Sequence, residues 1–338
     1  MGDGRLISKR VWDRLDGDAS VGPGHLRQRV SVDAPVDVYF AVERPSGSRV
    51  LALGFDQPPH TSLAQTVQLR GLRVSEAPFP MEQKPWTVSI ATSRAEDNDL
   101  FAELADDLVS VVSASPTGDD ASDALAVRLE CWHRFLDQAG SNGLSPEARV
   151  GLFGELWCLR ELLTPAVAVA EAVRSWRGPL GGSQDFQGAN WSVEVKASRQ
   201  LAPATIRVSN ERQLDAPKGF LSLLVVGLEE RSHSPETLPE IVASIRESLA
   251  NAPGASPAFE DRLLSAGYLD VQAHQYVDTG FAVRHVAAYA VGDAFPRIIE
   301  LTLPAGVGNV AYDLSLDACE PYRISVDQFR NQIAAAGK

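Results

Sequence analysis

The sequence is poor in the residues that mark disulfide-bonded and zinc-binding proteins. It has three cysteines in 338 residues, and no two of them form a Cys-x-x-Cys pair. This argues against a disulfide framework and a structural zinc site. One of them, Cys158, lies in an apolar segment, where a buried hydrophobic role fits it best. No second ligand at helical or hairpin spacing accompanies His233, His274 or His285, so we expect each to be a solvated or core residue.

Long apolar runs are also missing. The opening segment MGDGRLISKRVWDRL has no apolar stretch of signal-peptide length, and the longest apolar run, FLSLLVVGL, is far shorter than a membrane span. The sequence contains no Gly-rich phosphate loop and no Gly-x-Ser-x-Gly motif, so common nucleotide-binding and serine-hydrolase chemistries have no support. We expect a cytoplasmic protein with no membrane association.

Positive charge is scarce. Lysine and arginine number 31 against 44 acidic residues, which gives a formal net charge of −13. Proteins that bind DNA usually contact phosphates through a surplus of basic residues. The charge is unevenly distributed, because residues 95–127 hold nine acidic and no basic residues, whereas residues 174–213 hold six basic and three acidic ones. The second segment is locally positive, and we expect the isolated chain to bind DNA weakly and to depend on a partner protein.

The composition is that of a folded globular protein, with 44% hydrophobic and 22% charged residues. Residues 1–93 predict a β-rich unit, and apolar residues then recur at helical spacing over 99–113 and 123–138. Pro116 and Gly118 lie between these two helices and favour a domain boundary. We predict a β-rich N-terminal domain at 1–115, which docks a partner or DNA, and a second domain at 120–338. Strands are expected at 26–32, 36–43, 49–55, 68–74 and 86–92.

The second domain opens with a predicted helix that Ser145 caps and that Thr164 and Pro165 end. Its buried stripe consists of Leu152, Leu156, Leu159 and Leu163. The sequence places Glu155 at the edge of this stripe, where it could face a cleft. The alternative is a surface glutamate paired with Arg160 or another neighbour.

Acidic and basic side chains recur at short spacing in the hairpin that follows. In WSVEVKAS, alternation along a strand puts Glu194 and Lys196 on one face and the flanking valines on the other. Asp185 shares that face if the loop between the strands has an even number of residues, in which case we expect it to pair with Ser192. A three-residue loop would turn Asp185 away unless a bulge restored it. Two carboxylates and an ammonium group are therefore predicted to meet.

This arrangement resembles the PD-(D/E)XK nuclease superfamily, with Asp185, eight intervening residues and then Glu194-Val195-Lys196. Many members also carry a glutamate on the preceding helix, which Glu155 matches. The chain is similar to little-characterised members found among bacterial restriction and phage-defence genes, through WRGPLGGSQDF, VEVKAS, VSNERQL and DAFPRIIELTLPAGVGNVAYDLSL. The resemblance spans roughly residues 145–320. Gln184 replaces the proline of the motif, which is not a ligand in the family.

The resemblance implies an α/β, restriction-endonuclease-like fold, in which a mixed sheet is flanked by helices. A hairpin is expected at 183–198, followed by strands at 204–210, 219–228, 281–291, 296–302 and 310–316, with helices at 236–251, 256–267 and 325–337. The near-continuous apolar run at 219–228 is typical of a strand covered on both faces.

The resemblance also implies a Mg²⁺ or Mn²⁺ cofactor. The ligands it implies are Asp185, Glu194 and the main-chain carbonyl of Val195, and Glu155 would support a second metal or its waters. Lys196 would orient or deprotonate the attacking water, or offset charge in the transition state. Arg199 and Arg207 are candidates for contact with phosphate. Gln213, with neighbouring polar residues, either positions substrate or water or belongs to a solvated turn.

Two functions remain open from the sequence. The first is a metal-dependent DNA endonuclease of a bacterial restriction or phage-defence system, working with other proteins of that system. The second is a catalytically silent DNA-binding or assembly subunit of the same fold. A homodimer is an open alternative for either, and the sequence does not specify which DNA is recognised.

Overall fold

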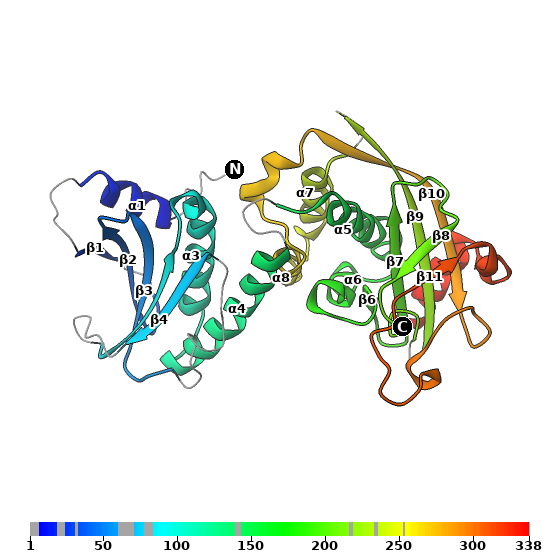
Figure 1. Cartoon of the computed structure of the whole chain (residues 1–338), viewed down its shortest axis with the longest axis horizontal. Helices are drawn as coiled ribbons and strands as arrows, with labels where there is room; N and C mark the ends of the chain where they lie inside the picture. The colour runs from blue at the N-terminus through cyan, green and yellow to red at the C-terminus, as the bar shows by residue number, and fades with distance from the viewer. Residues whose placement is uncertain are drawn as a thin grey trace. The chain divides into compact units, whose positions relative to one another are not determined.

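The computed structural model describes residues 7–18, 24–30, 33–59, 71–77, 84–138, 143–215, 219–232, 236–252 and 254–337 (Figure 1). Packing divides the chain into two compact units, Met1–Asn142 and Gly143–Lys338. The sequence pattern predicts a boundary between residues 115 and 120, whereas this division falls after helix α4 (Gly118–Gln138). His233, one of the histidines discussed above, lies outside the described residues.

The first unit contains a five-stranded antiparallel sheet with strand order β1-β2-β3-β5-β4. Its strands match the predicted segments closely, although residues 31–32 and 68–70 of two predicted strands lie outside the described part of the chain. The strand predicted at 68–74 begins at Leu72 in the structure, directly after a turn at Gly71. The strands are β1 (Gly24–Val30), β2 (Asp37–Arg44), β3 (Ser48–Phe55), β4 (Leu72–Ala77) and β5 (Trp86–Thr92).

Helices pack against this sheet through an aromatic core. Trp12 of α1 (Ile7–Asp16) contacts Phe40 and Phe101, with ring centroids 4.9 and 5.3 Å away. A short turn, η1 (Ala95–Asp97), leads into α3 (Asn98–Ser113), which packs against α4. Between them, Asp107 accepts hydrogen bonds from Arg128 and from the Trp132 indole at 2.6–2.7 Å. The acidic segment therefore contributes to packing as well as to a solvated surface.

The second unit is built on a mixed sheet with strand order β12-β10-β9-β7-β6. Strand β7 runs parallel to β9, and the other neighbouring pairs are antiparallel. This α/β arrangement of a mixed sheet with flanking helices is the predicted fold class. The strands are β6 (Phe186–Gln187), β7 (Trp191–Ser198), β9 (Phe220–Ser232), β10 (Thr279–Val291) and β12 (Arg323–Ile324).

One predicted strand does not join this sheet. The segment expected at 204–210 forms β8 (Thr205–Val208), which pairs only with β11 (Tyr312–Ser315) in a separate two-stranded sheet. Strand β9 occupies one edge of β7 along its whole length, and β6 occupies the other edge at Ser192 and Val193. The prediction of a strand at 296–302 is wrong, because the regular structure in that segment is a short 3-10 turn, η6 (Glu300–Thr302).

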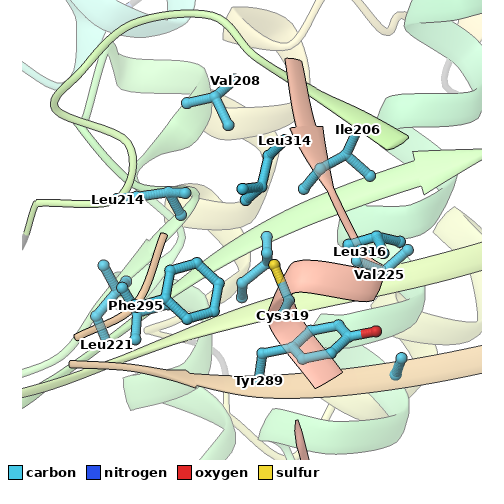
Figure 2. Packing of buried hydrophobic residues seen from close by; sticks show 13 residues of the cluster. Ile206, Val208, Leu214, Leu221, Val225, Tyr289, Phe295, Leu314, Leu316 and Cys319 are labelled. Carbon is cyan, nitrogen blue, oxygen red and sulfur yellow. The ribbon is translucent and has the colours of Figure 1, made fainter. Parts of the chain in front are cut away.

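The small sheet packs instead on one face of β9 and β10. Alternate residues of β8 and β11 point into a shared hydrophobic cluster, so the two sheets are joined by side chains rather than by backbone hydrogen bonds (Figure 2). The cluster contains Ile206, Val208, Leu214, Leu221, Leu223, Val225, Ala287, Tyr289, Val291, Phe295, Leu314, Leu316 and Cys319.

Helices α5 to α8 lie on the other side of the main sheet (Figure 1). Three helices of this unit begin with side-chain caps, at Ser145, Thr237 and Ser325. In the described residues, no helix has the length and apolar character that crossing a membrane requires. The helices and turns are α5 (Pro146–Cys158), η3 (Leu159–Leu163, π-helical), α6 (Val169–Ser175), η4 (Gly178–Leu180), α7 (Leu238–Leu249), α8 (Ser256–Ser265), η5 (Asp270–Gln275), η7 (Asp317–Tyr322) and α9 (Val326–Ala336).

Candidate active site

Strand β7 places an acidic and a basic side chain next to each other on one face. Lys196 Nζ lies 2.7 Å from Glu194 Oε1. Glu194 is buried, with 1% of its surface exposed, while 16% of the Lys196 side chain remains exposed. The intervening Val195 and its neighbour Val193 are buried in the core. The structure therefore brings Glu194 and Lys196 together in the way that strand alternation predicts.

Asp185 reaches the same place through a register that differs from the predicted one. Strand β6 pairs Phe186 with Val193 and Gln187 with Ser192, which puts Asp185 opposite Glu194 rather than opposite Ser192. The turn is centred on residues 189–190 instead of 188–189, with Gly188 N donating to Trp191 O at 2.8 Å. The loop is still even in length, so Asp185 keeps the expected face. Its Oδ2 accepts a 2.7 Å hydrogen bond from Val195 N.

A glycine leaves room beside the Asp185 carboxylate. The Asp185 carbonyl accepts hydrogen bonds from Arg177 N and Gly178 N at 2.7 and 2.9 Å. A Cβ atom added at Gly178 would lie 2.8 Å from Asp185 Oδ1 and 3.4 Å from Glu155 Oε2. Both carboxylates therefore border the space that the missing side chain leaves.

Glu155 extends toward this space from helix α5. A Cβ atom added at the preceding Gly154 would lie 2.5 Å from the Ala197 side chain, so the glycine permits close packing of the helix on β7. The Trp176 indole donates a 2.7 Å hydrogen bond to Glu155 Oε2. The alternative partner Arg160 instead binds Glu161 and Glu236. The structure thus directs Glu155 toward Asp185 and away from the solvated pairing.

The three carboxylates oppose one another electrostatically. Burial raises the pKa of Asp185 to about 6, against the lowering effects of the Val195 N–H and of Lys196. Burial and the charge of Asp185 raise the pKa of Glu194 to about 8. Burial, followed by the charge of Asp185, raises the pKa of Glu155 well above its ordinary value. The single ammonium group of Lys196 offsets these charges only in part. The cluster formed by Asp185, Glu194, Glu155 and Lys196 therefore favours either bound protons or an added cation.

The predicted substrate-binding residues separate into two groups. Gln213 belongs to the cluster, because its Oε1 accepts a 3.0 Å hydrogen bond from Lys196 Nζ. Arg199 and Arg207 are exposed, and both form ion pairs with carboxylates outside the cluster. Arg199 pairs with Glu147 and Glu230 at 3.0 and 3.5 Å, and Arg207 pairs with Asp313 at 3.1 Å.

The sequence patterns assigned no role in the site to three residues that lie near it in the chain or contact its members. Trp176 holds Glu155, and Gln184 holds the turn that contains Gln213. Arg177 is exposed and, in the part of the chain that the structure describes, has no ion-pair partner. The available signal was its position in WRGPLGG, directly before Gly178, because this segment begins nine residues before Asp185. Burial and the nearby charge of Arg177 lower the pKa of Arg262.

The donor atoms suit a hard divalent cation held partly by water. Among the described residues, no group of three or more His, Cys, Asp or Glu side chains is arranged to hold a metal ion. Magnesium, however, is usually bound by one or two carboxylates and several waters rather than by a complete protein cage. Glu194 Oε2 is buried without a hydrogen-bond partner, and Asp185 Oδ1 borders the space at Gly178. Asp185 and Glu194 therefore fit such an ion.

The mixed sheet flanked by helices is consistent with a PD-(D/E)XK-like fold. A family model described as "Putative PD-(D/E)XK family member, (DUF4420)" matches residues 8–317. Because the match covers nearly the whole chain, this protein belongs to the DUF4420 family. No curated protein and no solved structure gives a significant match.

The close contact at Gly154 generates a stability prediction. Gly154→Ala should lower the free energy of unfolding by about 1–3 kcal/mol, because the new Cβ atom overpacks the contact with Ala197. Gly151→Ala, one turn earlier on the same helix, is the matched control. A Cβ atom at Gly151 has no neighbour within 4 Å, so this change should stabilise the protein by up to about 1 kcal/mol. Urea unfolding measures both, and equal effects of the two variants would contradict the contact.

Proposed function

We propose that this protein is a metal-dependent DNA endonuclease that hydrolyses phosphodiester bonds in a bacterial restriction or phage-defence system, together with other proteins. Membership of a PD-(D/E)XK family supports a nuclease-like protein. The observation that carries the proposal is the convergence of Asp185, Glu194 and Lys196, with Lys196 Nζ 2.7 Å from Glu194 Oε1 and Val195 N 2.7 Å from Asp185 Oδ2. The resemblance to defence-associated proteins suggests the biological setting and a cytoplasmic location.

Asp185, Glu194 and the main-chain carbonyl of Val195 would hold Mg²⁺ or Mn²⁺. Such an ion supplies neutralisation of the phosphate charge and a lowered pKa of bound water. The protein contributes the rigidity of this set. Asp185 is fixed by Val195 N and, through its own carbonyl, by Arg177 N and Gly178 N, and Glu194 is fixed within the paired strand β7.

Lys196 is suited to orient the attacking water. An ammonium group has three donors, and in the described residues two of them are directed to Glu194 Oε1 and Gln213 Oε1. The remaining donor and the exposed part of the side chain are available to water or to a phosphate oxygen. Glu155 would assist from the helix side, where Trp176 keeps its carboxylate beside Asp185.

Arg177 is better placed than Arg199 or Arg207 to contact a DNA phosphate near the cluster. It precedes Gly178, whose backbone binds Asp185. No ion pair within the described residues engages its guanidinium, whereas the other two arginines are shared with carboxylates. An unpaired arginine is the usual residue for binding phosphate.

A second candidate function is a silent DNA-binding or assembly subunit. One observation favours it: in the part of the chain with described coordinates, no set of three metal-ligand side chains is preformed. The net charge of −13 also suits a chain that acts through a partner. A homodimer would satisfy the same need for additional DNA contacts. Retention of Lys196 beside Glu194 favours the catalytic function.

Metal binding should depend on pH. Because the folded-state pKa values of Asp185 and Glu194 lie near 6 and 8, above their ordinary values, protonation stabilises the metal-free fold. This contribution is full below a pH of about 4 and is lost as the pH rises through about 6 and 8. We predict that Mn²⁺ raises the melting temperature by about 2–6 °C more at a pH of about 8.5 than at about 5.5.

The control for this experiment is Glu194→Gln, which removes one of the titrating ligands. The variant should lose most of the Mn²⁺-induced increase in melting temperature at the higher pH. Scanning calorimetry with and without Mn²⁺ measures both effects. The same Mn²⁺-induced increase in the variant and in the unmodified protein would exclude Glu194 as a ligand.

Cleavage should require Lys196. Lys196→Ala is expected to slow hydrolysis of duplex DNA in Mg²⁺ by about 100- to 10,000-fold, because the water-orienting ammonium group is removed. Lys9→Ala, which changes an exposed lysine of the first unit, should cleave normally. Gel assays of plasmid cleavage and restriction of transformed plasmid in cells measure this prediction. Undiminished restriction by Lys196→Ala would favour the silent subunit.

Binding of DNA should depend more on Arg177 than on Arg199. In the Lys196→Ala background, Arg177→Gln is predicted to weaken binding to duplex DNA about 3- to 10-fold and to reduce the slope of log K against log salt by about 1. Arg199→Gln should have a smaller effect, because Glu147 and Glu230 already neutralise that guanidinium. Fluorescence anisotropy at several salt concentrations measures both slopes, and equal losses would show that Arg177 has no special position.

A further inference from the structure

A buried glutamine next to the cluster holds a neighbouring turn. Gln184, with 3% of its surface exposed, donates hydrogen bonds from Nε2 to the carbonyl oxygens of Arg212 and Asp215 at 2.6 and 3.1 Å. The Gln213 carbonyl lies 3.5 Å from the same nitrogen. The Gln184 oxygen accepts a 2.9 Å hydrogen bond from Gln187 Nε2. The amide nitrogen thus binds a turn distant in sequence, while the amide oxygen is held by the nearby Gln187.

The same turn presents Gln213 to the lysine. Gln213 Oε1 accepts hydrogen bonds from Ser209 N at 2.7 Å and from Lys196 Nζ at 3.0 Å. The backbone N–H fixes the position of the amide oxygen, and the amide oxygen in turn accepts from the ammonium group. With Glu194 Oε1 at 2.7 Å as the second acceptor, two of the three N–H directions of Lys196 are set by the protein. The direction of the third then follows from tetrahedral geometry.

Gln184 also adjoins Asp185 in the chain. Its backbone therefore leads into the carboxylate that Val195 N fixes, while its side chain leads through the turn and Gln213 to Lys196. The superfamily motif has proline at this position, and a proline side chain cannot donate a hydrogen bond. In this chain Gln184 is therefore linked both to the Asp185 carboxylate and to the Lys196 ammonium group, and can hold the two in a fixed relation.

We propose that Gln213 is a positioning residue that aims the Lys196 ammonium group, and that Gln184 secures the turn from which Gln213 acts. This inference rests on the proposed nuclease function. It changes the role of Gln213 from contact with substrate to orientation of Lys196. A residue that binds substrate chiefly raises KM, whereas a residue that orients a catalytic group chiefly lowers kcat.

The test compares variants of the full chain in Mg²⁺-dependent cleavage of a duplex DNA. Gln213→Leu removes the acceptor and should lower kcat about 10- to 100-fold with KM changed by less than about 3-fold. Gln213→Glu keeps an oxygen for Lys196 and Ser209 and should retain most of kcat. Gln200→Leu is the control, because Gln200 is exposed and, among the residues with described coordinates, its side chain makes no hydrogen bond, while its backbone N–H binds the Ser198 hydroxyl.

The link to Gln184 is tested by a double-mutant cycle. Gln184→Leu should lower kcat like Gln213→Leu, and the double variant should be no slower than Gln213→Leu alone, since both changes break one chain of contacts. Circular dichroism establishes that the variants fold. Because Gln184 is buried, the partly exposed Gln213 keeps the proposal testable if Gln184→Leu fails to fold. Multiplicative losses in the double variant, or a raised KM with unchanged kcat, would overturn the proposal.

A readout independent of cleavage separates this proposal from the nuclease assignment. Labelling of Lys196 by an acetylating reagent, followed by mass spectrometry, should increase several-fold in Gln213→Leu and stay unchanged in Gln200→Leu. If the unmodified protein cleaves no DNA but the labelling increases, the chain of contacts stands and its catalytic purpose falls. If the protein cleaves DNA and neither kcat nor labelling responds to Gln213→Leu, the positioning role alone is overturned.

Discussion

The second unit depends on holding one buried carboxylate, Glu194, and two partly buried ones, Asp185 and Glu155, near one ammonium group. Ionised carboxylates repel one another and lose hydration when they are buried. Burial raises the pKa of Asp185 to about 6, and burial together with the charge of Asp185 raises the pKa of Glu194 to about 8, even with Lys196 present. Such a cluster is unfavourable for stability by itself. Clusters of this kind, with raised pKa values and opposing charges, are typical of functional sites.

The surrounding backbone holds these acidic side chains together although their proximity is unfavourable. Strand β7 is paired on both sides, so Glu194 cannot move to solvent without breaking the sheet. Gly154 lets helix α5 approach β7, and Gly178 leaves space between Asp185 and Glu155. Uncharged donors hold two of the acidic side chains in place: the main-chain N–H of Val195 binds Asp185, and the Trp176 indole binds Glu155. The site is therefore rigid because of how the chain packs around it.

The sequence was sufficient for features that follow from local periodicity. Strand alternation placed Glu194 with Lys196, and the even loop length placed Asp185 on their face, although the turn itself lies one residue later than expected. Contacts between distant segments were beyond this reasoning. The separate sheet of β8 and β11 depends on which strand edges are already occupied, and the engagement of Arg199 by Glu147 depends on the path of a helix 50 residues earlier. Gln184 looked like a neutral replacement of proline because its partners are remote in sequence.

The division of the chain also has an evolutionary consequence. Asp185, Glu194, Lys196, Gln213 and Glu155 all belong to the unit Gly143–Lys338, and the hydrogen bonds described between them and their neighbours lie within that unit. The β-rich unit supplies none of the donors and acceptors of these hydrogen bonds, so its sequence can change without replacing any of them.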